Sequence, residues 1–279
     1  MVYKKYGITF RNMRKHKGFT LADFSDIGLA ASTLSEFERG KTMISLEKID
    51  NALQLIGHSL SDFDHFINDY STSDPIYIFH KMAEAYVVRD NDMLNNLYKI
   101  SQETNQIYVQ FTIGILLGYS SSEEIEILLN LLLSTKHWSL IELYIFYIIM
   151  HHISPKEVLK VLKVLEDNGK GVYVSKEFSS SVVLVLCESL LILTHYGYKE
   201  KTENIFRLIN ERKLDQSLFA KNLLHGLSGF WSFKFKNNKE GLLAIKETIN
   251  IFRLLKLENL ATFYQKKYEN YINLNHGDL

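Results

Sequence analysis

The chain has 279 residues, more than one compact core usually holds, so two domains are expected. Hydrophobic residues make up 46% of it, while Gly and Pro number only 14 and 2, which excludes a disordered or collagen-like protein and argues against an all-β fold. The 32 basic and 32 acidic residues cancel, so the total charge does not indicate a nucleic-acid-binding protein. The single cysteine, Cys187, excludes an internal disulfide framework and a multi-cysteine metal site.

No segment is predicted to be a secretory signal or to span a membrane. Residues 1–6 lack the apolar run of a signal peptide. The most apolar stretches, residues 138–153 and 181–193, are shorter than the roughly 20 residues of a membrane span, and each contains a glutamate. Together with the single cysteine, these features predict a cytoplasmic protein whose apolar helices are buried in its core.

The zero net charge conceals a strong local asymmetry. Residues 1–20 contain six basic residues and no acidic one, whereas residues 21–70 contain nine acidic and three basic residues. The first seventy residues are therefore neutral as a whole but include one strongly basic segment. Such a distribution is typical of a small domain that presents a basic face to a partner.

The first seventy residues are predicted to form a domain of five helices, because apolar residues recur there at helical spacing. Gly18 and Gly40 each follow such a stretch, where glycine ends a helix, and Ser45 can cap the helix that follows it. The predicted helices are residues 6–16, 20–26, 32–39, 46–56 and 60–69. The N-terminal domain is therefore placed at residues 1–70.

The polar residues 71–74, followed by Pro75 at the start of a helix, mark a domain junction. Beyond it, apolar periodicity predicts eleven helices: 75–90, 92–103, 105–118, 122–135, 137–151, 155–167, 178–196, 199–212, 215–235, 238–256 and 258–273. Short connections make neighbours antiparallel, so we expect an α-solenoid of tetratricopeptide type over residues 75–279. Gly229 and Gly241 have the spacing of small packing positions in one repeat. No clear repeat of about 34 residues is present, so a helical bundle that is not a solenoid stays an alternative.

Residues 20–40 have the pattern of a helix-turn-helix. Two short helices that cross steeply need apolar residues between them, and leucine and phenylalanine residues of this segment supply them. Ser25 is expected where the two helices touch, and Gly28 in the turn. Ser32 and Ser35 leave short polar side chains on the outer face of the second helix, able to approach base edges in a major groove.

The ending Phe37-Glu38-Arg39-Gly40 closely resembles the end of the recognition helix in the phage-repressor-like (XRE) class, which implies a lambda-repressor-like DNA-binding domain. The resemblance also implies that Glu38 forms a partly buried ion pair with Arg14 of the first helix, as part of the scaffold. Basic residues around the motif are placed to hold phosphates. The predicted DNA contacts are Lys15, Lys17, Thr20, Ala31, Ser32, Thr33, Ser35, Glu36, Arg39 and Lys41.

The whole chain resembles the Rgg/GadR/MutR regulators of streptococci and their relatives. Besides the helix-turn-helix, the match rests on Ile44-Ser45 after it and on residues 251–261, which resemble the last repeats of that family. The resemblance implies a cytoplasmic, homodimeric transcription regulator that binds a pseudo-palindromic operator in promoter DNA. It also implies that the repeat domain receives a short hydrophobic peptide pheromone in quorum sensing. Glu36 departs from the Arg, Lys or Gln that is frequent at its position in the XRE class, so the operator sequence is not predicted.

A peptide receptor needs donors and acceptors in its groove, because an extended peptide brings unpaired N–H and C=O groups. Several apolar helices of the second domain contain isolated polar residues, with aromatic residues near them. The predicted peptide contacts are Tyr144, Tyr147, His151, His152, Glu188, Asn222, His225 and Trp231. Asn222 is the strongest candidate, because its amide both donates and accepts. For any one of these residues, a satisfied core position or an exposed position is the simpler interpretation.

Catalytic and metal-binding signals are weak. The adjacent His151 and His152 point about 100° apart on a helix and cannot bind one metal ion. The sequence contains no His-Glu-x-x-His, Gly-rich phosphate loop or Gly-x-Ser-x-Gly motif, and Cys187 is expected to be buried and inert. We therefore expect no enzymatic activity, no metal and no cofactor. The alternative function is a helical-repeat scaffold or an antitoxin-like module that uses the helix-turn-helix against a protein partner.

Overall fold

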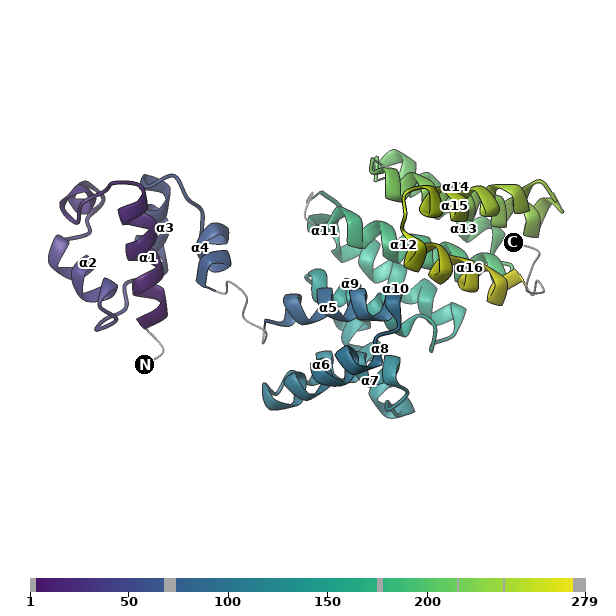
Figure 1. Cartoon of the computed structure of the whole chain (residues 1–279), viewed down its shortest axis with the longest axis horizontal. Coiled ribbons are helices and arrows are strands. Elements are labelled where there is room, and N and C mark those ends of the chain that lie inside the picture. The colour runs from purple at the N-terminus through teal and green to yellow at the C-terminus, as the bar shows by residue number, and fades with distance from the viewer. Residues whose placement is uncertain (1–3, 68–73, 175–177, 215, 238, 273–279) are drawn as a thin grey trace. The chain divides into compact units, whose positions relative to one another are not determined.

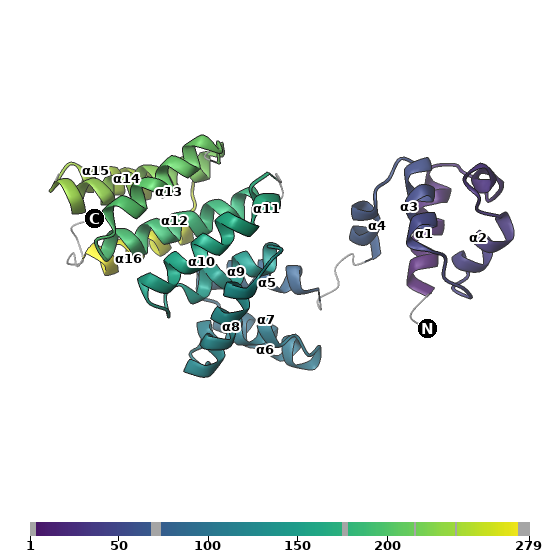
Figure 2. The same ribbon diagram turned by 180° about the vertical axis from the view of Figure 1, so that it is seen from behind.

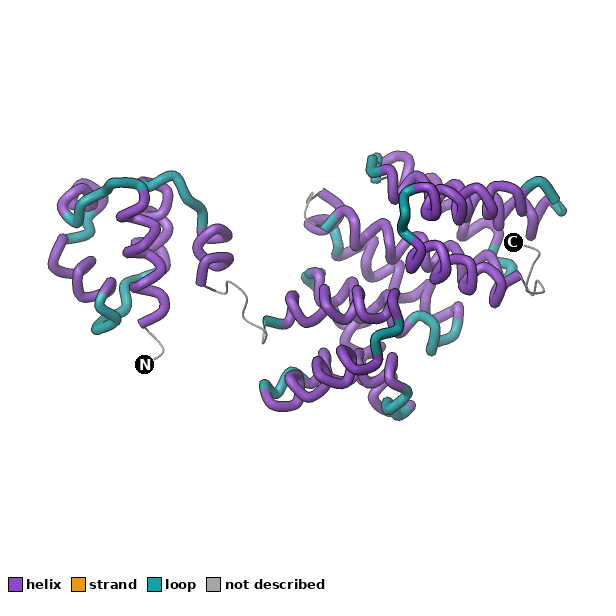
Figure 3. Tube along the Cα trace, viewed as in Figure 1, coloured by secondary structure: helices purple, strands orange, loops and turns teal. Residues whose placement is uncertain are grey.

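The computed structural model describes residues 4–67, 74–174, 178–214, 216–237 and 239–272. The chain divides into two units, Met1–Asp74 and Pro75–Leu279, whose helices are drawn in Figures 1 and 2. Each unit has a hydrophobic core of its own. Every regular element in the described ranges is a helix, as the colours of Figure 3 show. The all-α fold class predicted from the sequence is confirmed.

Within residues 4–67, the first unit contains four α-helices and one 3-10 helix. They are α1 (Lys4–His16), η1 (Ala22–Ile27), α2 (Ala31–Glu38), α3 (Leu46–Leu55) and α4 (Leu60–Ile67). The second predicted helix is thus a 3-10 helix of six residues. The Asp23 carboxylate accepts a hydrogen bond from the Thr20 N–H (2.6 Å) before η1, and Gly28, at φ 72°, ends it in the left-handed conformation. Short 3-10 segments are common as connectors between α-helices.

Phenylalanine side chains form the centre of the first core. Phe10 of α1 contacts Phe24 of η1, Phe37 of α2 and Phe63 of α4, with ring centroids 5.8, 6.0 and 6.4 Å apart. Edge-to-face and tilted pairs at these distances are favourable beyond the burial of their area. One side chain of α1 therefore orients three other helices, including α2 of the helix-turn-helix.

The prediction that Ser25 lies where the helices of the motif touch is wrong. Ser25 is exposed, and its hydroxyl donates to the Ala22 carbonyl inside η1 (2.8 Å). The tight contact of α2 is with α1 instead, where a Cβ atom added to Gly7 would overlap the carbonyl oxygen of Phe37. The small residue that this domain needs therefore lies on its first helix, outside the motif.

The second unit consists of twelve helices in the part of the chain that the structure describes. They are α5 (Pro75–Val88), α6 (Asn91–Glu103), α7 (Ile107–Leu117), α8 (Ser122–Ser134), α9 (Leu140–Ile149), α10 (Pro155–Asn168), α11 (Lys170–Val174), α12 (Ser179–His195), α13 (Lys199–Glu211), α14 (Leu218–Lys236), α15 (Gly241–Leu254) and α16 (Glu258–Ile272). The short α11 was not predicted. The predicted helix 137–151 begins at Leu140, because Ser139 and Glu142 form a capping box there.

Five of these helices, α5, α7, α9, α12 and α14, contact one another in that order. The others pack along this row, with α6 on α5 and α7, α8 on α7 and α9, α13 on α12, and α15 on α14. This arrangement is an array of helical hairpins. The last helix, α16, departs from a simple solenoid, in which each repeat contacts only its neighbours. It packs against α15, α12 and also α5, and so brings the end of the array back to its first helix.

In the second unit, α14 and α15 approach each other closely at two glycines. A Cβ atom added to Gly229 would overlap the carbonyl oxygen of Gly241, and one added to Gly241 would overlap that of Gly229. The two backbones can approach this closely only because neither residue has a side chain. The spacing of the two glycines in the sequence thus marks a genuine packing contact.

Candidate functional site

In the first unit, a buried ion pair fixes α2 against α1. Arg14 donates from Nε to Glu38 Oε1 (2.6 Å) and from Nη2 to Glu38 Oε2 (2.8 Å), and both side chains are buried. Its Nη1 donates to the Phe19 carbonyl (2.6 Å), which anchors the chain before η1. The hydrogen bond with Glu38 raises the pKa of Arg14 above its usual value. This bidentate hydrogen bonding fixes the orientation of α2 as well as its distance from α1.

Most of the predicted DNA contacts are accessible. Lys15, Lys17, Thr20, Ala31, Ser32, Glu36, Arg39 and Lys41 are exposed, and Thr33 and Ser35 are half-buried. On α2, Ser32 and Glu36 lie one turn apart and share a face that points away from the buried Leu34. Arg39 follows at the end of α2, where its Nε donates to the Ser35 carbonyl (3.1 Å). The outer face of α2 therefore carries a short polar side chain near its start and the acidic Glu36 in its last turn, and the basic Arg39 follows just beyond its end.

Lys17 faces a different surface. Together with Asn12 and His16 of the α1 segment, it lines an open groove whose other wall includes His58 and Phe66 beside α4. Lys17 therefore belongs to a groove between α1 and α4, whereas Arg39 and Lys41 belong to the end of α2. Of the basic residues predicted to hold phosphates, Arg39 and Lys41 are those that directly follow α2.

The start of α2 has no side-chain cap. Ala30 occupies the N-cap position and forms no side-chain hydrogen bond with the first turn, whereas Ser45 of α3 accepts one from the Lys48 N–H. The first N–H groups of an α-helix have no partner within the helix. At the start of α2 these groups, together with the positive end of the helix dipole, are suited to an anion such as a DNA phosphate.

In the second unit, three predicted peptide contacts meet around a residue that was not singled out from the sequence. Lys267 of α16 pairs with the buried Glu188 of α12 and donates to the Tyr147 hydroxyl of α9 (3.2 Å). His151, just after α9, lies with Nε2 3.0 Å from Glu188 Oε1 and with Nδ1 3.0 Å from the Tyr271 hydroxyl. These five side chains, here called the buried polar cluster, join α9, α12 and α16.

The two charges of this cluster depend on each other. Burial alone would raise the pKa of Glu188, but the positive charge of Lys267 and the contact with His151 lower it to about 2. Burial would likewise lower the pKa of Lys267, and Glu188 raises it above its usual value. Within the cluster, Glu188 therefore acts as an anchor for α16, and its carboxylate is already occupied by protein groups.

Two further predicted peptide contacts hold α14 to its neighbours. Asn222 Nδ2 donates to the Thr248 carbonyl (3.0 Å), and the Thr248 hydroxyl donates to the Asn222 carbonyl (3.1 Å), which ties α14 to α15. The Oδ1 atom of Asn222 is buried and has no hydrogen-bond partner among the described residues. Trp231 Nε1 donates to the Thr202 hydroxyl of α13 (2.9 Å). Both side chains thus serve helix packing.

The remaining predicted peptide contacts are dispersed. His225 is exposed, with Nε2 2.7 Å from Glu247 Oε2, and His152 is exposed after α9. Tyr144 is buried, and its hydroxyl lies 3.2 Å from His80 Nδ1. The eight candidates therefore do not form one surface. The polar atoms of most of them are already used in contacts with neighbouring helices.

An apolar cavity of about 100 Å³, also called the aromatic cavity below because of its lining, lies among α5, α9, α12, α14 and α16. Its aromatic lining residues are Tyr86, Tyr144, Tyr147, Phe219, Phe263 and Tyr264. An engineered cavity of about 150 Å³ admits benzene, so this one has room for a single aliphatic side chain. Only Tyr144 and Tyr147 were singled out from the sequence. The other four were missed, since an aromatic residue on the apolar face of a helix looks like ordinary core.

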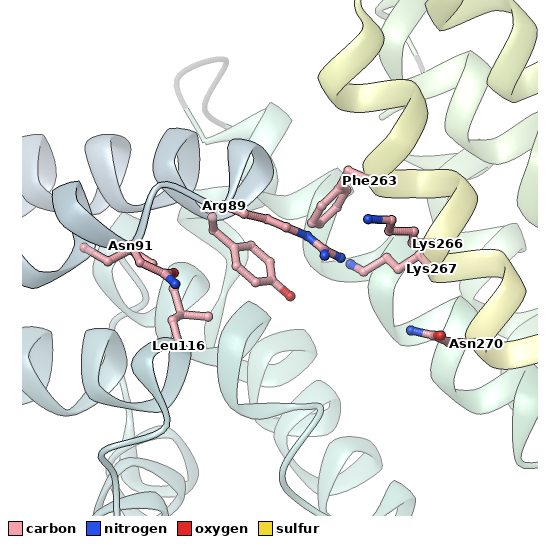
Figure 4. A pocket seen from close by; sticks show the side chains of 9 residues that line it. Arg89, Asn91, Leu116, Phe263, Lys266, Lys267 and Asn270 are labelled. Carbon is pink, nitrogen blue, oxygen red and sulfur yellow. The ribbon is translucent and has the colours of Figure 1, made fainter.

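A second cavity, of about 270 Å³, adjoins the first and shares Tyr86 and Phe263 with it. Figure 4 shows that it lies between α16, which contributes Lys266 and Asn270, and the turn after α5, which contributes Arg89. Its lining combines apolar and aromatic side chains with basic and amide groups, which are absent from the lining of the first cavity. The sequence gives no local signal for this site, because its walls are far apart along the chain.

Metal-ligating groups, the cysteine and the apolar helices were also singled out by the sequence. No group of three or more His, Cys, Asp or Glu side chains there could hold a metal ion. Cys187 is buried, as predicted, and burial raises the pKa of its thiol. None of the described helices combines the length and the apolar character needed to cross a membrane.

Two family models match the chain, one for each unit. A helix-turn-helix model matches residues 10–63. The model of the C-terminal domain of the HTH-type transcriptional regulator Rgg matches residues 89–266. The second match covers more than half of the chain and runs from just after α5 into α16. It includes Tyr147, His151 and Glu188 of the buried polar cluster, while α5, Lys267 and Tyr271 lie outside it.

Solved structures share the fold over nearly the whole length. The SHP pheromone receptor Rgg2 of Streptococcus dysgalactiae superposes with a TM-score of 0.75 at 20% identity, covering 95% of this chain and 99% of that one. The PrgX/cCF10 complex gives a TM-score of 0.66 at 13% identity over 96% and 99% of the two chains. The structure of a bacterial peptide pheromone/receptor complex gives a TM-score of 0.70 at 12% identity, covering 97% of this chain and 99% of that one. The extent of the family match, with this shared fold, shows that the chain belongs to the Rgg family of helix-turn-helix transcriptional regulators.

Proposed function

We propose that this regulator binds promoter DNA through α2 as a cytoplasmic homodimer on a pseudo-palindromic operator, and that a short hydrophobic peptide bound in its repeat domain controls it. The observation that carries the peptide proposal is the aromatic cavity among α5, α9, α12, α14 and α16. Five helices meet there, including the first and the last of the second unit, so a side chain inserted into the cavity would contact all of them. Solved proteins of the same fold include pheromone receptors, which supports the choice of ligand.

The DNA-binding arrangement rests on the geometry of α2. Its inner face is fixed by the Arg14–Glu38 pair, its start is uncapped, and its end is followed by the exposed Arg39 and Lys41. We propose that the uncapped N–H groups and these two cations hold phosphates, while Ser32 and Glu36 face base edges. The two recognition helices of a dimer would then meet half-sites about one helical turn, or a multiple of it, apart.

Binding to promoter DNA at several salt concentrations tests this arrangement. We expect a steep salt dependence, with the slope reduced by about one unit in each of the variants Arg39→Ala and Lys41→Ala, because each removes one phosphate contact. Lys160→Ala, which removes an exposed lysine of α10, is the matched control and should leave the slope unchanged. A protein that ignores DNA at low salt would contradict the proposal.

The peptide proposal is tested by thermal unfolding with hydrophobic peptides encoded near the gene. A peptide that binds the folded state raises the melting temperature by mass action, by an amount that grows with its concentration. Ala83→Leu, which adds bulk to the cavity lining, should abolish this rise. Thr262→Leu adds similar bulk to an exposed position of α16 and should preserve it. If no such peptide changes the melting temperature, the ligand assignment is wrong.

A further inference from the structure

The basic cavity between α5 and α16 differs in character from the apolar cavity that it adjoins. Its polar lining consists of Arg89, Asn91, Lys266, Lys267 and Asn270, and none of the residues that line it is acidic. Three cations and two amides thus surround one opening of about 270 Å³. A site that concentrates positive charge without a carboxylate of its own is complementary to an anion.

Two of the three cations are available to such an anion. Lys267 is already paired with Glu188 in the buried polar cluster. Within the described residues, neither Arg89 nor Lys266 forms an ion pair, and Arg89 is exposed while Lys266 is half-buried. Figure 4 shows the Arg89 side chain reaching from the turn after α5 toward Phe263 and Lys267 of α16. The two cations therefore approach the cavity from opposite walls.

The residues shared by the two cavities connect apolar and basic surfaces. Tyr86 and Phe263 line both of them, so an apolar side chain in one cavity and a charged group in the other would contact the same two rings. A short peptide has one end that carries a negative charge, its C-terminal carboxylate. A guanidinium binds a carboxylate through two parallel N–H···O bonds, and an ammonium adds a third donor.

We infer that this basic cavity binds the C-terminal carboxylate of the peptide, through Arg89 and Lys266, while an apolar side chain near that end occupies the aromatic cavity. The inference rests on the proposed peptide function and adds the direction in which the peptide lies. The carboxylate would bridge the turn after α5 and α16, two segments far apart in sequence, and the complex would hold them together more firmly than the free protein does.

The test uses the full-length protein and a fluorescent library of apolar hexapeptides, synthesised once with free C-termini and once as C-terminal amides. For members that bind as free acids, the dissociation constant should be at least about tenfold higher for the amide, because a charged hydrogen-bond acceptor is lost. Arg89→Gln and Lys266→Gln should weaken binding of the free acid and leave binding of the amide nearly unchanged. Lys156→Gln, at an exposed position of α10, is the control and should change neither.

Each outcome separates this inference from the function on which it rests. If acid and amide bind equally, the carboxylate site is wrong while the peptide function stands. If neither form of any member binds, the peptide function fails and this inference falls with it. An amide library ending in aspartate distinguishes the source of the charge: restored binding would mean that a side-chain carboxylate serves as well, which overturns the assignment to the C-terminus.

Discussion

Each unit of the chain contains a buried ion pair that joins helices. Arg14–Glu38 joins α1 to α2, and Glu188–Lys267 joins α12 to α16. Removing two charges from water costs nearly as much as their attraction returns, so such pairs contribute little net stability. Loss of one partner is more damaging, because the other charge then stays buried without compensation.

This asymmetry leads to a prediction for the first pair. We expect Arg14→Met and Glu38→Leu each to lower the free energy of unfolding by about 3–5 kcal/mol, because each leaves one buried charge unpaired. The double variant should lose much less than the sum of the two, since neither charge remains. Chemical denaturation of the four proteins measures this cycle. Additive losses would show that the two side chains act independently.

The second pair leads to a prediction about pH. Lys267 and His151 hold the pKa of Glu188 at about 2 in the folded protein, against 4.5 for a glutamate side chain in water. The stabilisation that this difference represents is present above about pH 4.5 and is lost as the pH falls toward 2, and it amounts to about 3 kcal/mol in full. In Glu188→Gln, the free energy of unfolding should therefore fall less steeply below pH 4.5 than in the wild type. Equal slopes in denaturant titrations at a series of pH values would contradict this expectation.

The two pairs differ in how far the sequence predicts them. Arg14 and Glu38 belong to one motif, whose resemblance to the XRE class implies their contact. Lys267 lies 79 residues after Glu188, in a helix rich in charged residues, where a lysine is typical of a solvated face. Only the packing of α16 against α12 brings Lys267 to Glu188, and no local pattern encodes that packing.

At the scale of elements, two close helix contacts depend on glycine. Gly7 allows α1 to meet the backbone of α2, and the pair Gly229 and Gly241 allows α14 to meet α15. A methyl group at such a position has no room and must displace a helix backbone, which costs more than moving a side chain. These contacts therefore set the spacing of the helices that carry the candidate sites.

We expect Gly7→Ala to lower the free energy of unfolding of the first unit by about 1–3 kcal/mol, because its Cβ would overlap the Phe37 carbonyl oxygen. Gly171→Ala in α11 is the control, since an added Cβ meets no atom within 4 Å there. An alanine in that helix should be neutral or stabilising, by up to about 1 kcal/mol. Similar losses in both variants, measured by denaturant titration, would mean that the close approach of α1 and α2 is unimportant.

Element boundaries could be predicted best where a capping box marks them. The predicted helix starts at residues 122 and 155 are those of α8 and α10, where Ser121 and Ser154 form capping boxes. The 3-10 form of η1 and the presence of α11 could not be predicted, because five or six residues contain too little periodicity. Long helices with caps are thus readable from the sequence, and short connecting turns are decided by their surroundings.

At the scale of the whole molecule, the candidate peptide site depends on the return of α16 to α5. The aromatic and basic cavities both use residues from α5 and α16, the first and last helices of the second unit. The periodicity of each helix predicts that it buries one face but not which partner covers that face. The array of hairpins could therefore be predicted from the sequence, whereas the cavities closed by α16 could not.

The separate cores of the two units imply that the full chain unfolds in two steps. The buried residues of one core come from residues 10–63 and those of the other from residues 78–268. We expect Glu38→Leu to lower the midpoint of one thermal transition only, and Gly229→Ala, which would overlap the Gly241 carbonyl, to lower only the other. Scanning calorimetry resolves the transitions, and the two variants separate them even where they overlap in the wild type. A single transition that both substitutions shift equally would mean that the DNA-binding and repeat units unfold as one cooperative body.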